Sequence, residues 1–478
     1  MPEKFYITTS IAYTNAIPHI GFALESLQAD ALARYHSQLG EETFFLTGTD
    51  EHGSKIAKEA EKAGQDPKSF VDKISHRFSE LKSILNLSNN YFIRTTDEKK
   101  HWPSVKKIWE KLVENKDIYK KEYRGLYCVG CEAFLTRKDL IDGKCAVHQK
   151  EPEAVNEENY FFRLSKYGEQ IKEAIVSKRM NIVPESRANE MLSFLDQGLE
   201  DVSFSRPRKD LRWGFPVPND DSHTIYVWAD ALTNYISALG YDKESKLFNK
   251  FWPADVHCLG KDILRFHALI WPGILLSAGL SLPKNILVHG HIMSGGQKMS
   301  KSLGNVVDPF ELVKKYGTDA VRYFLLREIS TTEDGDFTIE KFEERYNADL
   351  AGGIGNLLSR VLTVAEKIDS KNDKLDPDIQ KEIKAVKDKY HASFKEYKIT
   401  EAIKAIWELI SYCDRYIEQQ KPWQTKDPKT INSLLACLKE ISLLLEPILP
   451  ETAEKISKQV LQRKKGEQLF KKLVLDIS

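Results

Sequence analysis

The fold is decided by residues 4–21, KFYITTSIAYTNAIPHIG. Residues 4–10 are rich in β-branched and aromatic side chains and predict a strand, and Asn15 and Pro18 then mark a turn. Residues 21–40, GFALESLQADALARYHSQLG, carry apolar side chains at helical spacing, and residues 43–50, TFFLTGTD, predict a second strand. Strand, turn, helix and strand in this order open a parallel α/β domain.

The rest of the chain changes character twice. Residues 117–225 are rich in loops, and strand signals resume only at 224–232, 255–263 and 285–293, so the middle segment resembles an insertion that splits one sheet domain. After about residue 350 the apolar spacing is helical in four successive stretches. The sequence therefore predicts a split α/β domain followed by an all-α domain.

Composition limits the classes of protein that fit. The 478 residues contain 70 basic and 70 acidic side chains, so a globally basic nucleic-acid binder is disfavoured. No signal peptide is visible at the N-terminus, and the apolar stretch at 268–280 is too short to span a bilayer. We therefore expect no membrane association. Six cysteines, three of them clustered at 128–145, do not form a disulfide framework and indicate a reducing, cytoplasmic setting with one metal site.

Pro18-His19-Ile20-Gly21 lies where the first strand gives way to the helix. A helix N-terminus offers free N–H groups and a positive dipole to a phosphate, Gly21 allows close approach of a nucleotide, and His19 can donate a hydrogen bond. An ordinary turn with a surface histidine is the alternative, and four residues alone do not exclude it.

Lys298-Met299-Ser300-Lys301-Ser302 follows a predicted strand and is flanked by glycines. Lys298 and Lys301 can close on a triphosphate and offset the charge that develops on a leaving pyrophosphate, with Ser300 between them. A solvated basic loop is the alternative.

Cys128 and Cys131 are followed, after thirteen residues, by Cys145 and His148. Two pairs, each with two residues between the ligands, match the spacing of a tetrahedral zinc site. Four protein ligands leave no open position, so the predicted zinc is structural.

TGTDEHG at residues 47–53 places Asp50 at the carboxyl end of a strand, where ligands bind in open α/β sheets. A carboxylate there can pair with a substrate ammonium, although Asp is also a common helix cap. His267 and Trp271 are four residues apart on a predicted helix and so share a face. With Trp228 and Tyr235 they could surround a thioether, or they could be ordinary core residues.

Taken together, these segments resemble class I aminoacyl-tRNA synthetases, specifically the methionyl family. The resemblance covers essentially the whole chain. It favours the functional interpretation of these motifs over the ordinary structural alternatives given above. It is carried by 6–21, 44–53, the cysteine cluster at 128–148, WGFPVP at 213–218, YVWADAL at 226–232, GKDILRFHALIWP at 260–272 and GQKMSKSLGNVVDP at 296–309.

The resemblance implies a Rossmann-type catalytic domain in two halves, 1–116 and 226–305, around a zinc-bearing insertion at 117–225. A stem-contact segment at 306–350 and a helical anticodon-binding domain at 351–478 would follow. The partners implied are ATP with Mg²⁺, L-methionine and tRNA(Met). The appended domain that supports dimerisation in some relatives is not visible, so a monomer is expected.

Residue roles are carried over by motif. The methionine site would be lined by Ile11, Tyr13, Asp50, Trp228, Ala231, Tyr235, Ile263, His267 and Trp271, with Asp50 holding the amino group. ATP would bind His19, Gly21, Lys298, Ser300 and Lys301, of which His19 and the two lysines would be catalytic. Asn356, Arg360 and Trp423 resemble the anticodon readers of the family. One departure is clear, because the usual second histidine of the first motif is Phe22 here.

Three other classes of protein share parts of this pattern. A synthetase for leucine or cysteine would share the two nucleotide motifs but not TGTDEHG and YVWADAL. A simple nucleotidyltransferase would lack the helical C-terminal part, and an RNA-binding zinc protein would not need KMSKS. The resemblance favours the methionyl family over all three.

Overall fold

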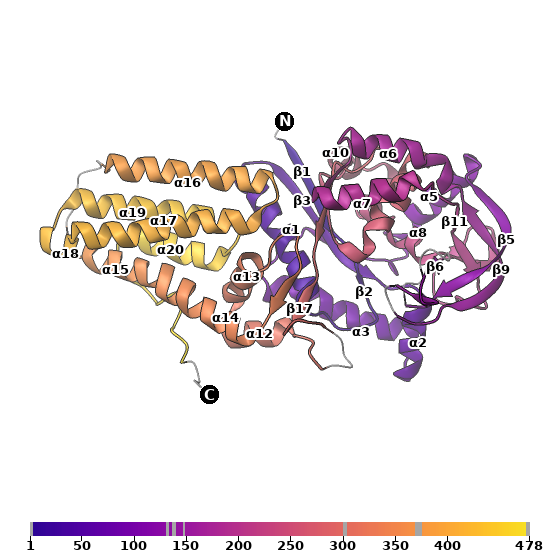
Figure 1. The fold of residues 1–478 in the computed structure, drawn as a ribbon, viewed down its shortest axis with the longest axis horizontal. Coiled ribbons are helices and arrows are strands. Elements are labelled where there is room, and N and C mark those ends of the chain that lie inside the picture. The colour runs from indigo at the N-terminus through magenta and orange to yellow at the C-terminus, as the bar shows by residue number, and fades with distance from the viewer. Residues whose placement is uncertain are drawn as a thin grey trace. The chain divides into compact units, whose positions relative to one another are not determined.

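A computed structural model describes residues 3–130, 133–135, 140–146, 149–299, 304–368 and 375–474, without the side chains of 133, 134 and 298. The chain forms two compact units, labelled by element in Figure 1. The first contains Met1–Pro18, Glu42–Glu80 and Asn89–Val288, and the second contains His19–Glu41, Leu81–Ser88 and His289–Ser478. No helix in the described ranges is long and apolar enough to cross a membrane.

A parallel sheet forms the centre of the first unit. Its strand order is β10-β16-β15-β1-β3-β2, with β4 paired to β3. The strands are β1 (Lys4–Thr9), β2 (Ala12–Tyr13), β3 (Glu42–Asp50), β4 (Tyr91–Arg94), β10 (Asn181–Val183), β15 (Val256–Gly260) and β16 (Asn285–His289). Ile7 is in register with Phe45 of β3 and Val256 of β15. All but the first residue of β1 are buried, as expected for a strand covered on both faces. The predicted parallel α/β fold is confirmed.

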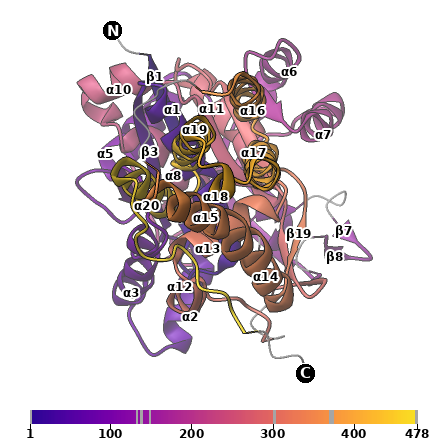
Figure 2. The same ribbon diagram turned by 90° about the vertical axis from the view of Figure 1, so that its left-hand side faces the viewer.

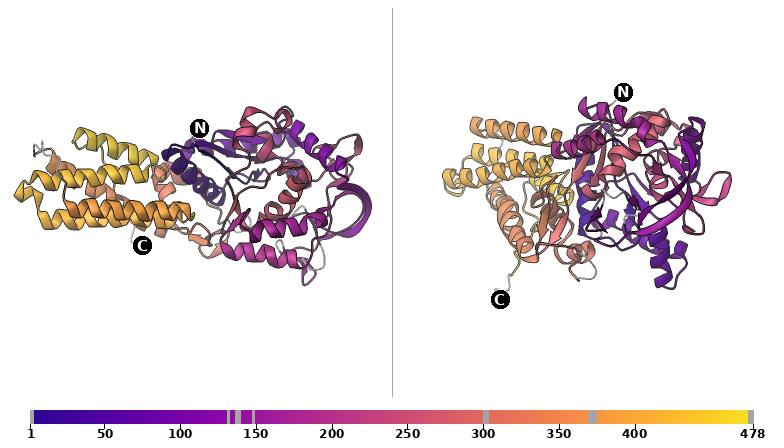
Figure 3. Two further views of the ribbon diagram at one scale, coloured as in Figure 1. Left: turned by 90° about the horizontal axis from the view of Figure 1, so that it is seen from above. Right: turned by 45° about the vertical axis from the view of Figure 1, so that its right-hand side comes forward.

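The segment at 117–225 begins with a long antiparallel pair, β5 (Ile118–Cys128) and β9 (Glu153–Phe162), which curve together in Figure 3. Helices α6 (Gly168–Val176) and α7 (Glu185–Asp196) flank β10, which pairs in parallel with β16 of the central sheet. The middle segment thus supplies an edge strand of the sheet. This strand is only three residues long, so no strand signal drew attention to it.

The second unit contains α1 (Ile20–Gln38) and a helical C-terminal region. Figure 2 looks along α16 (Pro377–Lys395), α17 (Ile399–Gln420) and α19 (Pro428–Leu445), which pack on one another. Helix α15 (Asn356–Ala365) follows a π-helix at Tyr346–Gly355. Asp376 and Asp427 cap α16 and α19 with a proline directly after each cap, which is why these helices begin where they do.

Arg322 of α13 (Thr318–Arg327) joins several parts of the second unit. Its guanidinium donates to the carbonyl oxygens of Ile448 at 2.7 Å, Leu85 at 2.9 Å and Pro447 at 3.1 Å. It also pairs with the carboxylate of Asp30 on α1 at 2.7 Å, and neither side chain is exposed to solvent. One buried cation therefore fixes α1, α13 and the turn before α20 (Pro450–Gln462) together.

Candidate active site

Tyr235 of α9 (Asn234–Ser237) is the centre of a buried aromatic cluster in the first unit. Its hydroxyl lies 2.7 Å from Nε2 of His267. Its ring centroid lies 4.3 Å from that of His257 and 5.9 Å from that of Trp271. The structure therefore brings Tyr235, His267 and Trp271 together, as the sequence predicted, and adds His257.

The proton on His267 can be placed from its neighbours. Nδ1 lies 3.0 Å from the carbonyl oxygen of Ile263, which can only accept, so Nδ1 donates and Nε2 accepts from the Tyr235 hydroxyl. Burial lowers the pKa of His267 to about 4, against the smaller raising effects of the Ile263 carbonyl and Asp262. The imidazole is therefore neutral at pH 7.

The backbone under this cluster is unusual. Phe266–Ile270 forms a π-helix that continues into α11 (Trp271–Ser277), so His267 and Trp271 are not separated by a normal α-helical turn. π-Helical turns are frequent at functional sites. Phe266 stacks on Trp228, with ring centroids 3.7 Å apart and planes 5° apart.

Four further predicted site residues lie in the same unit, and two of them are next to His267: the Trp228 ring centroid is 6.3 Å from that of His267, and the Ile263 carbonyl faces its Nδ1. All four are half-buried apolar or aromatic side chains packed against the buried core of the unit: Ile11, Tyr13, Trp228 and Ile263. Ala231 is buried on α8 (Val227–Ala231). Buried rings with half-exposed neighbours at their edge are suitable for an apolar side chain that enters from solvent.

Asp50 is the last residue of β3, at the carboxyl end of the sheet. Tyr13 of β2 is in register with Asp50. The backbone carbonyl of Asp50 accepts from both the N–H and the hydroxyl of Thr14, each at 3.0 Å. These contacts hold Tyr13 and Asp50 on neighbouring strands.

The two residues after Asp50 are committed to other partners. Glu51 is fully buried and accepts from Nε of Arg94 at 2.7 Å and from Nη2 at 2.9 Å, which is a bidentate pair. His52 places Nδ1 2.6 Å from a carboxylate oxygen of Asp230 on α8. The second oxygen of Asp230 lies 3.0 Å from Nε2 of His101, whose Nδ1 is 2.8 Å from the hydroxyl of Ser237.

Asp230 remains ionised in this setting. Burial opposes its ionisation, but the charge of His52 and the hydrogen bonds from His101 and His52 outweigh burial and lower the pKa of Asp230 to about 2. Sequence reasoning singled out neither Asp230 nor His101, and it met His52 only as a letter of the TGTDEHG motif.

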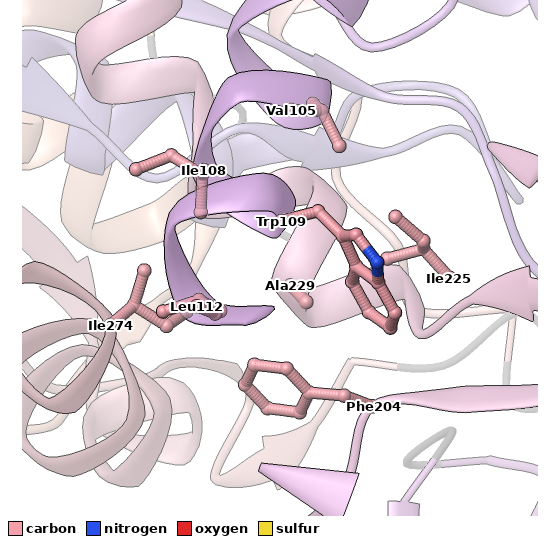
Figure 4. A pocket seen from close by; sticks show the side chains of 8 residues that line it. All are labelled: Val105, Ile108, Trp109, Leu112, Phe204, Ile225, Ala229 and Ile274. Carbon is pink, nitrogen blue, oxygen red and sulfur yellow. The ribbon is translucent and has the colours of Figure 1, made fainter. Parts of the chain in front are cut away.

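A small apolar cavity lies next to α8. Its volume is about 10 Å³, and Ala229 of α8 borders it. Figure 4 shows the other lining side chains: Val105, Ile108, Trp109 and Leu112 from α5 (Trp102–Glu114), with Phe204, Ile225 and Ile274. A space of this size without polar partners does not suit an ordered water. The Ala229 side of α8 therefore faces mainly apolar side chains.

The predicted phosphate motif lies at the start of α1 in the second unit. His19 is the N-cap, and its Nδ1 accepts from the Gly21 N–H at 3.0 Å, so Nε2 carries the proton in the neutral ring. A Cβ on Gly21 would lie 2.8 Å from Cε1 of His19, which explains the glycine. The Ile20 N–H donates to the carbonyl of Val307 at 3.1 Å. The PHIG turn thus contacts the segment just after KMSKS.

The KMSKS segment begins in a hairpin of β17 (Ile292–Ser294) and β18 (Gln297–Lys298). Gly295 and Gly296 form its two-residue turn with φ of 61° and 75°, values that favour glycine at both positions. The Gly296 N–H donates to Asp336 at 2.8 Å. The side chain of Lys298 and all of Ser300 and Lys301 lie outside the described residues.

Half of the predicted zinc cluster can be seen. Cys128 ends β5 and Cys145 ends β8 (Lys144–Cys145), and both are buried. The Cys145 carbonyl accepts from the Gln149 N–H at 2.8 Å. Cys131 and His148 lie outside the described residues, and the parts of the chain that are described contain no group of three or more candidate ligands.

The predicted anticodon residues lie in the helical region. Asn356 begins α15 and is exposed, and Trp423 on α18 (Pro422–Thr425) is 44% exposed. Arg360 is half-buried, and its guanidinium pairs with Asp414 at 3.4 Å and with Glu418 at 2.5 Å. Two of the three side chains are therefore accessible, and the third is held by carboxylates of α17.

Comparison with known proteins is consistent with this geometry. The family model "tRNA synthetases class I (M)" matches residues 5–138 and 131–362, and "Anticodon-binding domain of tRNA ligase" matches residues 376–474. Methionine--tRNA ligase of Thermotoga maritima is 43% identical over 96% of this chain and 75% of its own length. The Brucella suis enzyme of the same name is 41% identical over 95% of this chain and 91% of its own length.

Solved structures agree with the sequence comparisons. Mycobacterium tuberculosis methionyl-tRNA synthetase in complex with methionyl-adenylate superposes with a TM-score of 0.89, at 37% identity, and covers 95% of this chain and 93% of its own. The apo form of the same enzyme gives a TM-score of 0.85 at 32% identity, over 99% of each chain.

Proposed function

Because this chain belongs to the methionine family of class I tRNA synthetases, we propose that it attaches methionine to tRNA(Met) with ATP through a methionyl-adenylate. The observation that carries the proposal is the 43% identity to a methionine--tRNA ligase over 96% of this chain. The cluster around Tyr235 supports it independently, because aromatic edges make favourable contacts with a thioether.

The methionine site consists of the residues grouped around that cluster. Tyr13, Tyr235 and His267 face the sulfur, and a neutral imidazole suits this role because it does not place a charge beside an apolar group. Asp50 pairs with the ammonium at the carboxyl end of the sheet. The remaining wall is formed by Ile11, Trp228, Ala231, Ile263 and Trp271.

The reaction requires no side-chain nucleophile. The methionine carboxylate attacks the α-phosphate of ATP and pyrophosphate leaves. The terminal ribose hydroxyl of the tRNA then attacks the carbonyl of the methionyl-adenylate, takes the aminoacyl group and releases AMP. Nε2–H of His19 and the side chains of Lys298 and Lys301 bind phosphate oxygens, with Gly21 and Ser300 beside them. Mg²⁺ accompanies ATP and neutralises phosphate charge. Catalysis comes from positioning and from stabilisation of charge on the pyrophosphate.

Further features complete the proposal. Cys128, Cys131, Cys145 and His148 hold one structural Zn²⁺, which fixes the tip of the β5–β9 pair. Asn356, Arg360 and Trp423 read the anticodon.

The domains have the limits predicted from the sequence above, and the enzyme acts as a cytoplasmic monomer. Loss of zinc from Cys145→Ser, measured by elemental analysis of dialysed protein, tests the metal site separately from activity.

ATP–pyrophosphate exchange tests the function. Exchange that depends on methionine and not on leucine or cysteine supports it, and exchange with leucine or cysteine but not methionine overturns it. Lys301→Ala should lower the exchange rate strongly. Asp50→Asn should raise the KM for methionine about tenfold or more, the effect of losing a charged hydrogen bond.

Phe22 needs its own measurement, because a phenylalanine cannot donate to phosphate or ribose. Comparing the ATP KM and kcat of the natural protein with those of Phe22→His shows whether the departure from the family motif matters. We expect a lower ATP KM in the variant. If the ATP KM and kcat are unchanged, Lys298, Lys301 and His19 are sufficient to bind ATP without a second histidine.

A further inference from the structure

We propose that Asp230, His52 and His101 form a buried clamp that positions the two sides of the methionine site, which makes all three positioning residues for this reaction. The inference rests on the proposed function. It concerns residues that lie behind the substrate and are assigned no contact with it.

The first step concerns protons. An ionised carboxylate only accepts hydrogen bonds, so each histidine must present an N–H to Asp230. The donor is Nδ1 in His52, at 2.6 Å, and Nε2 in His101, at 3.0 Å. Each ring therefore presents one defined nitrogen to Asp230, and the two donors are different atoms of the imidazole.

The second step concerns what each end of the clamp holds. His52 follows Asp50 by two residues, and its backbone N–H lies 3.5 Å from Oδ1 of Asp50. The side chain and the backbone of this one residue therefore face Asp230 and Asp50 respectively. On the other side, Asp230 lies between Trp228 and Ala231 on α8. The clamp thus connects the carboxylate proposed for the ammonium with the helix proposed for the methionine side chain.

The third step concerns α8 itself. It has only five residues, and its length gives it little stability of its own. Ala229 faces the apolar cavity of Figure 4, and Trp228 stacks on Phe266. Apolar contacts of these kinds are not directional, whereas the bonds to Asp230 are. The bonds to Asp230 therefore add directional contacts to the apolar packing of α8 and help to fix its orientation.

His101 extends the clamp to α9. Its Nδ1 lies 2.8 Å from the hydroxyl of Ser237, two residues after Tyr235. The three elements that carry Asp50, Trp228 and Tyr235 are thus connected through a single buried carboxylate, whose side chain is 1% exposed.

Amide substitutions test the clamp, because an Asn amide nitrogen lies near the Nδ1 position of histidine and a Gln amide nitrogen lies near Nε2. His52→Asn and His101→Gln keep the donor, and His52→Gln and His101→Asn move it. We expect the KM for methionine in ATP–pyrophosphate exchange to stay within about threefold for the first pair. It should rise about tenfold or more for the second pair and for Asp230→Asn, with the ATP KM unchanged.

The crossed pattern separates positioning from general stability. A purely structural role would lower Tm or the fraction of active enzyme, without a methionine KM that follows the position of the donor. Asp117→Asn is the matched control: Asp117 is buried in the same unit and accepts from Lys166 at 2.8 Å and Ser277 at 2.7 Å. We expect it to lower Tm and to leave the methionine KM unchanged.

The outcomes distinguish the two proposals. If the natural protein shows no methionine-dependent exchange, the proposed function fails. If it is active but both substitutions of His52 and both of His101 give the same methionine KM, the clamp is overturned. The four histidine variants keep the test valid if Asp230→Asn does not fold.

Discussion

Replacing Arg322 with methionine should strongly destabilise the second unit. Arg322 and Asp30 are both fully buried, 2.7 Å apart, and the guanidinium also donates to four backbone carbonyls. Methionine keeps most of the volume but leaves the Asp30 carboxylate with one fewer cation. Breaking a buried pair in this way costs about 3–5 kcal/mol.

The expected change can be measured as a thermal shift. For a unit of about 150–250 residues, 1 kcal/mol corresponds to about 2–4 °C, so the Tm of Arg322→Met should fall by roughly 6–20 °C. Differential scanning calorimetry of the full chain at neutral pH is the assay.

A matched surface arginine supplies the control. Arg345 pairs with Glu328 at 2.9 Å and with Asp349 at 3.5 Å, but its side chain is 38% exposed. Exposed pairs contribute about 0–1 kcal/mol, so Arg345→Met should shift Tm by no more than about 4 °C. A Tm decrease for Arg322→Met that is no larger than this would refute the reasoning.

Acid supplies a second check on the same pair. Burial raises the pKa of Asp30, but the charges of Arg322 and Arg34 and the hydrogen bonds from Ser88 outweigh burial and hold it below its ordinary value of 3.8. A lowered carboxyl pKa stabilises the fold above the unfolded pKa, and this stabilisation is lost as the pH falls through the folded pKa. The Tm difference between the natural protein and Asp30→Asn should therefore shrink below about pH 4.

Three other predictions follow from single contacts. Gly21→Ala should raise the ATP KM and leave the methionine KM unchanged, because its Cβ would lie 2.8 Å from Cε1 of His19 and displace the N-cap; equal constants would contradict this. Burial lowers the pKa of His267 from 6.5 to about 4. As the pH falls from 6.5 to 4, the unfolded chain is protonated at this residue before the folded chain, so the stability of the fold decreases. Between pH 7.5 and 5 the Tm of His267→Asn should therefore fall by less than the Tm of the natural protein. Trp423→Ala should raise the KM for tRNA, since stacking on one base contributes about 1–3 kcal/mol, and leave ATP–pyrophosphate exchange unaltered.

Local patterns predicted the elements well. The first strand, the first helix and the second strand were expected at 4–10, 21–40 and 43–50, and the structure places them at Lys4–Thr9, Ile20–Gln38 and Glu42–Asp50. Alternation, helical spacing and capping residues depend only on neighbours in the sequence, so they can be recognised without knowledge of the fold. The same holds for α16, α17 and α19, whose apolar faces repeat over several turns.

Features that depend on distant residues could not be predicted. His52 and Asp230 are 178 residues apart, and His101 and Asp230 are 129 apart, so nothing in the spacing of either pair indicated a contact. The π-helix at Phe266–Ile270 is also invisible, because it spans only five residues inside an apolar stretch. His267 and Trp271 were expected to share a face for an α-helical reason. Both side chains do contact Tyr235, but from a π-helical and not an α-helical backbone.

The TGTDEHG motif shows why residue type alone could not assign roles. Asp50, Glu51 and His52 are consecutive and could each bind a substrate or another side chain. Strand β3 ends at Asp50, and the two residues that follow it contact different partners. Glu51 forms a bidentate pair with Arg94, and His52 meets Asp230. A bidentate guanidinium neutralises the charge of Glu51, which makes it a poor partner for an ammonium. Asp50 is the carboxylate in register with Tyr13. Because Glu51 and His52 already have long-range partners, Asp50 is the residue of the three that is favoured as the substrate ligand.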